Sequence, residues 1–154
     1  MEITGEYRIA APREVVWRAV LDPAVLAACI PGCKSLEQTG EGAYAAKVQI
    51  KVGPVSATFS GTVELQDQDP PAGCRIVGQG NGGIAGFAKG EAKVSLAEDG
   101  EETVLTYVAD AQIGGKLASL GGRLIQATAK KLSDQFFSAF AATVAAPTDP
   151  APAA

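Results

Sequence analysis

The pattern with the clearest link to a known chemistry is the glycine run at residues 78–83 (GQGNGG), which satisfies the GxGxxG pattern of dinucleotide-binding sites. Such a site needs the glycines to open a helix, because the helix N-terminus holds the pyrophosphate. Here they lead into residues 85–96, whose pattern predicts a strand, and Asp99 stands in a hairpin turn. The sequence therefore favours a glycine hairpin, or a mobile cavity rim beside Ile84 and Phe87, over a nucleotide site.

Thiols are the second group with reactive potential, and the chain contains Cys29, Cys33 and Cys74 but no histidine. The missing histidine removes the commonest general base, the commonest zinc ligand and every His-dependent triad. Three sulfur ligands fall short of the usual four of a structural zinc site, and Pro31-Gly32 breaks any helical register between the first two. We interpret the cysteines as buried, inert thiols and expect neither a metal site nor catalytic residues.

Bulk composition narrows the class of protein further. The 154 residues are 47% hydrophobic, which is enough for one domain with a sizeable core, and abundant small residues can leave space inside it. The net charge of −4 argues against a nucleic acid partner. No run of 18 apolar residues predicts a transmembrane helix, and the N-terminus shows no secretory signal, so we expect a cytoplasmic protein.

The order of predicted elements is strand, two short helices, about six strands and one long helix. Apolar residues alternate in 2–9, 43–52, 55–65 and 105–113, and hairpin turns separate the later strands. Short helices are predicted from Pro12 to about Pro23 and around 24–28, and a long amphipathic helix over 116–142. We predict an α+β domain over 1–144, in which a curved antiparallel sheet of about seven strands wraps the long helix. A disordered Pro/Ala-rich tail is predicted at 145–154.

Several side chains point inward in this arrangement. Tyr7, Tyr44 and Tyr107 could hydrogen-bond a carbonyl or serve as acids, or simply pack their rings. Phe59 faces inward near Gly61, where the missing side chain leaves room either for a ligand or for the helix.

The long helix carries two features with alternative interpretations. Gly121-Gly122 is unusual inside a helix, because each glycine costs ~1 kcal/mol against alanine, and it favours a kink or the close approach of a ligand. Lys116, Arg123 and Lys130 repeat at seven, so they form one narrow stripe. Such a stripe either lies on anionic lipid or is a solvated face.

Motifs in a fixed order carry a resemblance to a known family. They cover residues 1 to about 140. In order they are MEITGEY (1–7), APREVVW (11–17), ACIPGCK (28–34), VGPVSATFSG (52–61), GFAKG (86–90), GGKL (114–117), LGGRLI (120–125) and AKKLSDQFF (129–137). In these segments the chain resembles the carbon monoxide dehydrogenase G-subunit (CoxG) family of the helix-grip superfamily, which includes START and Bet v 1-like domains (SRPBCC). The resemblance implies a cavity between sheet and helix.

The resemblance also implies a function. It implies a non-enzymatic protein that binds an apolar small molecule, best a quinone or lipid, with no covalent cofactor. The implied partner is a molybdenum carbon monoxide dehydrogenase or related hydroxylase, which the protein would link to the quinone pool through peripheral contact with the inner face of the membrane. The alternatives are an assembly or membrane-recruitment factor that acts through protein contacts, and a cyclase- or hydrolase-type enzyme.

The candidate cavity residues come from the inward faces, the glycine segment and the long helix. They are Tyr7, Ile30, Phe59, Gly61, Phe87, Tyr107, Leu117, Leu120, Leu124 and Thr128. For the leucines and Thr128, a plain core role stays equally open.

Overall fold

The computed structural model describes residues 1–145, so the expected tail lies outside the described residues except for Ala145, the last residue of the final helix. The fold is the predicted helix-grip arrangement. Its elements are β1 (Glu2–Ile9), α1 (Arg13–Leu21), α2 (Pro23–Cys29), β2 (Cys33–Gly40), β3 (Ala43–Val52), β4 (Val55–Asp69), β5 (Gly73–Asn81), η1 (Gly83–Ala85), β6 (Phe87–Asp99), β7 (Glu102–Gly114), η2 (Gly115–Leu120) and α3 (Gly122–Ala145).

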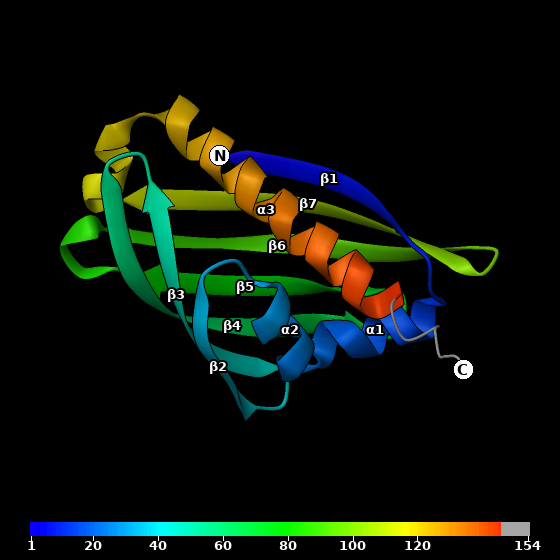
Figure 1. Cartoon of the computed structure of the whole chain (residues 1–154). Helices are drawn as coiled ribbons and strands as arrows, with labels where there is room; N and C mark the ends of the chain where they lie inside the picture. Colours follow the sequence, from blue (N-terminus) through cyan, green and yellow to red (C-terminus); the bar gives the residue numbers. More distant parts are fainter. Residues whose placement is uncertain (146–154) are drawn as a thin grey trace, which may run out of the picture.

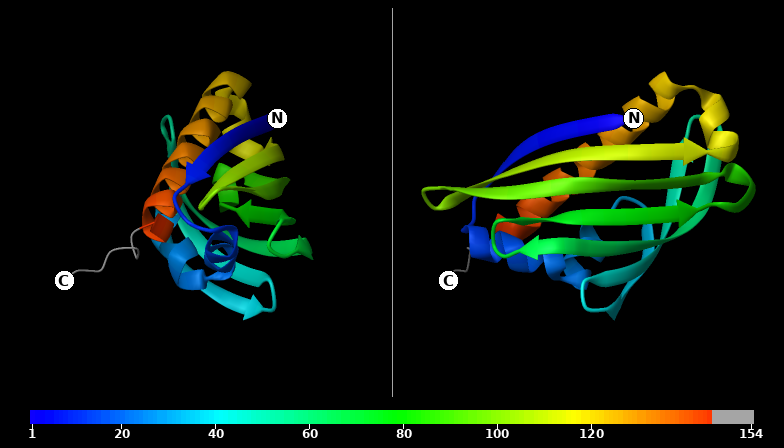
Figure 2. Two further views of the ribbon diagram at one scale, coloured as in Figure 1. Left: turned by 90° about the vertical axis from the view of Figure 1, so that its right-hand side faces the viewer. Right: turned by 180° about the vertical axis from the view of Figure 1, so that it is seen from behind.

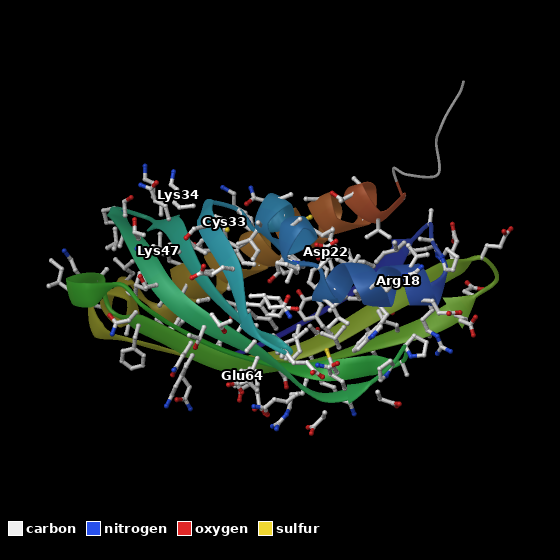
Figure 3. All side chains as sticks on the ribbon, turned by 90° about the horizontal axis from the view of Figure 1, so that it is seen from below. Arg18, Asp22, Cys33, Lys34, Lys47 and Glu64 are labelled. Atoms are coloured by element: carbon white, nitrogen blue, oxygen red, sulfur yellow. The ribbon has the colours of Figure 1, made fainter. Side chains whose placement is uncertain are left out.

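The seven strands form one antiparallel sheet in the order β1-β7-β6-β5-β4-β3-β2. Strands β2 to β7 follow one another as a meander, and β1 closes the row beside β7. The sheet curves, and α3 crosses its concave face diagonally (Figures 1 and 2). In the view from below, Lys47 on β3 and Glu64 on β4 lie on the outer face of the sheet, away from α3 (Figure 3). One face of the sheet is therefore covered by helix and the other faces solvent.

Proline and aspartate residues set the starts of the two short helices. Pro12 precedes the first turn of α1, where a missing N–H costs nothing. The Asp22 carboxylate accepts a hydrogen bond from the Ala24 N–H at 2.9 Å, and Pro23 occupies the first turn of α2. These contacts fix a tight corner between α1 and α2, which places α2 against the C-terminal half of α3 (Figure 1).

The continuous helix predicted over 116–142 is wrong in one respect. A 3-10 helix, η2, ends at Leu120, and α3 begins only at Gly122. Gly121 between them has φ +97°, a conformation that side-chain-bearing residues rarely adopt. Of the glycine pair that looked unusual inside a helix, Gly121 thus separates two helices and Gly122 begins the second.

The glycine run at 78–83 does not open a helix that could hold a pyrophosphate. It ends β5 and leads through the three-residue η1 into β6, with Gly83 at φ +67°. This agrees with the expected hairpin, and the nucleotide interpretation has no structural basis.

The hydrophobic core is divided into two clusters of buried side chains. The larger one surrounds Phe140 and Leu105 beneath the C-terminal half of α3. The smaller one joins Val52, Phe59 and Leu117 at the other end of the sheet, beneath η1 and η2. The candidate site lies between these clusters.

Candidate ligand-binding cavity

A cavity of about 510 Å³ lies between the concave face of the sheet, α2 and α3. This volume falls within the range of small-molecule sites. Its wall is overwhelmingly apolar. The lining residues from the helices, η2 and the α2–β2 connection are Val20, Leu26, Ile30, Leu117, Ile125, Thr128, Ala129, Leu132, Phe136, Phe137 and Phe140. Those from the sheet are Leu36, Tyr44, Ala46, Val48, Ile50, Val52, Phe59, Gly61, Thr62, Val63, Leu65, Ile76, Gln79, Gly80, Ala88, Val94, Leu105 and Ile113.

The space exists because small residues line up across the sheet. Strand pairing places Ala46 opposite Gly61, Gly61 opposite Gly80, and Gly80 opposite Ala88. These four residues belong to four successive strands and all border the cavity. Side chains of ordinary size at these positions would fill the volume under α3, so the row of small residues keeps the two core clusters apart.

Two glycines of this row serve different purposes. A Cβ on Gly61 would stand 2.6 Å from the Gln79 carbonyl oxygen, so the close approach of β4 and β5 requires glycine there. A Cβ on Gly80 would meet nothing closer than the Phe59 Cβ at 3.8 Å, an ordinary van der Waals contact. Gly80 is therefore not required by the backbone, and its missing side chain contributes space.

Two of the hydroxyl-bearing residues that border the cavity, Tyr44 and Thr128, donate hydrogen bonds to the main chain. Tyr44 donates to the Leu21 carbonyl oxygen at 2.6 Å, and Thr128 donates to the Leu124 carbonyl oxygen at 2.9 Å. Burial, together with the nearby Asp22 carboxylate, raises the pKa of Tyr44, so this phenol keeps its proton at neutral pH. No Asp, Glu, Lys, Arg or Cys belongs to the lining. The wall can hold an apolar body but offers no ready acid–base pair.

Half of the ten predicted residues border the cavity. They are Ile30, Phe59, Gly61, Leu117 and Thr128. They come from the end of α2, from β4, from η2 and from α3. The structure brings these residues to one wall, although they are separated by up to about a hundred positions in the chain. Whether they contact a ligand stays a prediction.

Tyr7 and Tyr107 point inward as their strand alternation predicts, but they do not border the cavity. Their rings lie side by side with centroids 6.4 Å apart, and both stack on Phe137, with centroids 4.8 and 4.9 Å from its own. Phe137, which does line the cavity, therefore separates both tyrosines from it.

The hydroxyls of these two tyrosines differ. Tyr7 donates to an Asp134 carboxylate oxygen at 2.5 Å, and burial together with this bond raises the pKa of Tyr7. The same bond, with Lys130 beside it, lowers the pKa of Asp134. The Tyr107 hydroxyl is buried and has no hydrogen-bond partner among the described residues. Neither tyrosine is placed to orient a molecule in the cavity as the structure stands.

Phe87 does not border this cavity. Along β6 the inward positions are Ala88, Ala92, Val94 and Leu96, and Phe87 falls on the opposite face. Its ring covers Gly114 on the neighbouring strand, where a Cβ would clash with it. The expectation rested on closeness to the glycine run rather than on alternation.

Leu120 and Leu124 also lie outside the cavity lining. Leu120 belongs to η2 and packs on the smaller core cluster. Leu124 is exposed and lies beside Gly53. Each four-residue step along a helix rotates by about 40° beyond a full turn, so Leu124 has turned about 160° away from Phe140. Ile125, about 60° from Phe140, takes the inward position instead.

Sequence reasoning missed most of the aromatic wall and three of the four small residues in the row. Phe136, Phe137 and Phe140 line the cavity from α3, and Ala46, Gly80 and Ala88 line it from the sheet. For the helix the sequence did contain a signal, because the three phenylalanines lie on the apolar side of the predicted amphipathic helix. For the sheet the signal needed the strand register, which the sequence does not state.

Two further site types can be addressed for residues 1–145. No group of three or more Asp, Glu, His or Cys side chains is placed to hold a metal ion in this part of the chain. Within the same residues, no helix combines the length and hydropathy needed to cross a bilayer. Cys29 and Cys74 are buried as expected, Cys33 is half-buried, and all three are free.

A curved seven-stranded sheet, a long C-terminal helix and a cavity between them define a START-like helix-grip protein, the class of fold that carries a hydrophobic ligand-binding site. The family model for the carbon monoxide dehydrogenase G-subunit (CoxG) matches residues 5–145. The chain therefore belongs to this family, whose name places it beside carbon monoxide dehydrogenase as an accessory subunit. A comparison with curated protein sequences finds no significant match.

Several solved structures share this fold. A conserved protein from Geobacillus kaustophilus is 35% identical, with a TM-score of 0.88, over 95% of this chain and 96% of its own. The Zhui aromatase/cyclase from Streptomyces sp. R1128 is 16% identical, with a TM-score of 0.73, over 100% and 99%. A START superfamily protein from Mycobacterium smegmatis is 16% identical, with a TM-score of 0.70, over 93% and 96%. The last two show the fold alone.

Proposed function

We propose that this protein is a non-enzymatic carrier of an apolar small molecule, best a quinone or a lipid. The observation that carries the proposal is the 510 Å³ cavity whose lining holds no carboxylate, amine, guanidinium or thiol. Burial of apolar surface, at ~25 cal/mol per Å², would supply most of the binding free energy. Since Tyr44 and Thr128 donate to the main chain, we expect selection by shape and apolarity more than by a hydrogen-bonded head group.

The family supports the partner in this proposal. The carrier would serve a molybdenum carbon monoxide dehydrogenase or a related hydroxylase and would link it to the membrane quinone pool. In this arrangement the cargo, rather than the protein itself, carries the electrons.

An enzymatic function of the cyclase type is the main rival, because one structural relative is an aromatase/cyclase. Such chemistry needs a positioned acid or base. In this cavity the only tyrosine is Tyr44, whose raised pKa and engaged hydroxyl suit a structural role. We therefore favour the carrier.

The experiment that tests the carrier uses a short-chain benzoquinone and a short-chain naphthoquinone as probes. Trp17 is the single tryptophan of the chain and is buried in the larger core cluster, so quinone binding can be followed by quenching of its fluorescence. We expect saturable quenching near one quinone per chain. A co-purifying quinone or lipid, found by native mass spectrometry on protein from its own host, would name the cargo.

Two results would contradict the carrier. Linear, unsaturable quenching by both probes, with no apolar molecule co-purifying, would show that the cavity does not bind such ligands. Stable capture of the dehydrogenase by a protein that binds no probe would instead support an assembly or recruitment factor.

A further inference from the structure

One end of the molecule carries only positive charge. The turn between β3 and β4, η1, η2 and the first turn of α3 gather there, at the left of Figure 1. We name this surface the basic end and define it as residues 51–57, 81–89 and 113–125. Its charged residues are Lys51, Lys89, Lys116 and Arg123, all exposed, and it contains no Asp or Glu.

The rest of the chain has the opposite balance. Outside the basic end, the chain carries the remaining nine of its 13 lysines and arginines and all 17 of its acidic residues. None of the four cations of the basic end forms an ion pair among the described residues, whereas Arg8, Arg13 and Arg75 elsewhere do. The charge is therefore segregated, and the basic end presents unneutralised cations to whatever approaches it.

The same end exposes apolar side chains. Ile84 is 92% exposed at the tip of η1, and Phe87 and Leu124 are also exposed there. Its neighbour Ala85 is buried in the smaller core cluster, so η1 is anchored while Ile84 projects outward. Gly83 at φ +67° and Gly86 at φ +119° frame this tip. A protruding aliphatic side chain on a surface that also carries unpaired cations matches the surface of an anionic bilayer, in which apolar groups insert and cations meet head groups.

The cavity reaches towards this surface. Val52, Ile113, Leu117 and Ile125 all belong to the basic end and all line the cavity. A molecule that leaves a bilayer docked at this end would meet the apolar side chains of the smaller core cluster, beneath η2, before it reaches the cavity.

We infer that the basic end docks on an anionic lipid bilayer, with Ile84 inserting between the lipids, and that it is the end through which the cavity exchanges its cargo. The exchange part rests on the proposed carrier function, whereas the docking part does not. Phosphate head groups bind Lys116 and Arg123, and the acyl region receives Ile84.

The experiment is co-sedimentation of the full chain with vesicles of phosphatidylcholine, with or without phosphatidylglycerol. We expect binding to the anionic vesicles at low salt, weaker binding at high salt, and little binding to neutral vesicles. Ile84→Ser should weaken binding by about tenfold or more, because an isoleucine side chain no longer inserts. Lys116→Gln with Arg123→Gln should weaken it by about fivefold for each charge.

Matched variants separate this surface from a general effect. Val108→Ser removes another exposed aliphatic side chain, on β7 away from the basic end. Arg18→Gln with Lys93→Gln removes two exposed cations that form no ion pair among the described residues, and Figure 3 shows Arg18 on α1, towards the opposite end of the molecule. These controls should bind as the wild type does.

The outcomes distinguish docking from carrying. Wild-type protein that ignores anionic vesicles, or controls that lose as much binding as Ile84→Ser, would overturn the inference and point to an acidic protein surface as the partner. Loading of the quinone probes from vesicle-free solution tests the carrier alone, and Ile84→Ser should load like the wild type. Vesicle binding without any quinone loading would keep the docking surface and refute the carrier.

Discussion

Replacement of Gly80 by valine tests the origin of the cavity most directly. A Cβ at this position has an ordinary 3.8 Å neighbour, and the residue borders the empty volume. Valine adds three carbon atoms there, each worth about 0.8 kcal/mol on burial, or about 2.4 kcal/mol in all. After the cost of ordering the side chain, we expect the free energy of unfolding to rise by about 2 kcal/mol.

Ligand affinity should move in the opposite direction. A quinone that loses contacts equivalent to three buried carbons loses about 2.4 kcal/mol of binding free energy, which raises its dissociation constant by about 50-fold. Urea unfolding measures the stability, and quenching of Trp17 measures the affinity.

Gly78→Val is the matched control for this variant. Gly78 lies two residues away on the same face of β5, a Cβ added to it would have no neighbour closer than 3.5 Å, and it does not line the cavity. We expect the control to leave quinone affinity within about twofold, since it removes no apolar contact with the ligand. The reasoning would be refuted if Gly80→Val lowered the free energy of unfolding by ~1–3 kcal/mol, as an overfilled core does, and left quinone affinity unchanged.

Three other substitutions should report on single contacts. Gly61→Ala should lower the free energy of unfolding by about 1–3 kcal/mol in urea, because its Cβ would stand 2.6 Å from the Gln79 carbonyl oxygen; unchanged stability would contradict this close approach. Tyr107→Phe should raise stability by about 1 kcal/mol by removing an unpartnered buried hydroxyl, and a loss instead would reveal a partner. Burial raises the pKa of the Cys74 thiol from 9.0 to about 11, so the contribution of this thiol to folding stability is present below pH 9 and is lost as the pH rises through 11. Cys74→Ala should therefore flatten the decline in the free energy of unfolding between pH 9 and pH 11. An unchanged decline would mean that another group causes it.

Local patterns in the sequence predicted the strands well. The alternation in residues 2–9 and 43–52 gave the bounds of β1 and β3 as the structure has them. Period-two alternation reflects the pleat of a single strand, so it needs no knowledge of distant residues. The same is true of Pro12 and Pro23, which mark the starts of the two short helices.

Positions that depend on accumulated rotation were less secure. A regular three-and-four spacing assigned Leu124 to the inner face of one long helix. In the structure Gly121 separates η2 from α3, which begins only at Gly122, and the helical rotation carries Leu124 outward. Ile125 then takes the inward place. The existence of the apolar stripe was predictable, but its phase at the far end was not.

The sequence by itself determined the helix-grip fold, the order of its elements and an interior rich in small residues. Only the tertiary structure decided that Ala46, Gly61, Gly80 and Ala88 form one row, that Phe137 screens Tyr7 and Tyr107 from the cavity, and that the segments carrying Ile84 and four cations gather at one end of the molecule. The physical reason is that strand alternation and helix caps are local properties of the chain. Cavities and charged surfaces instead arise from the register between strands and from the angle at which α3 crosses them.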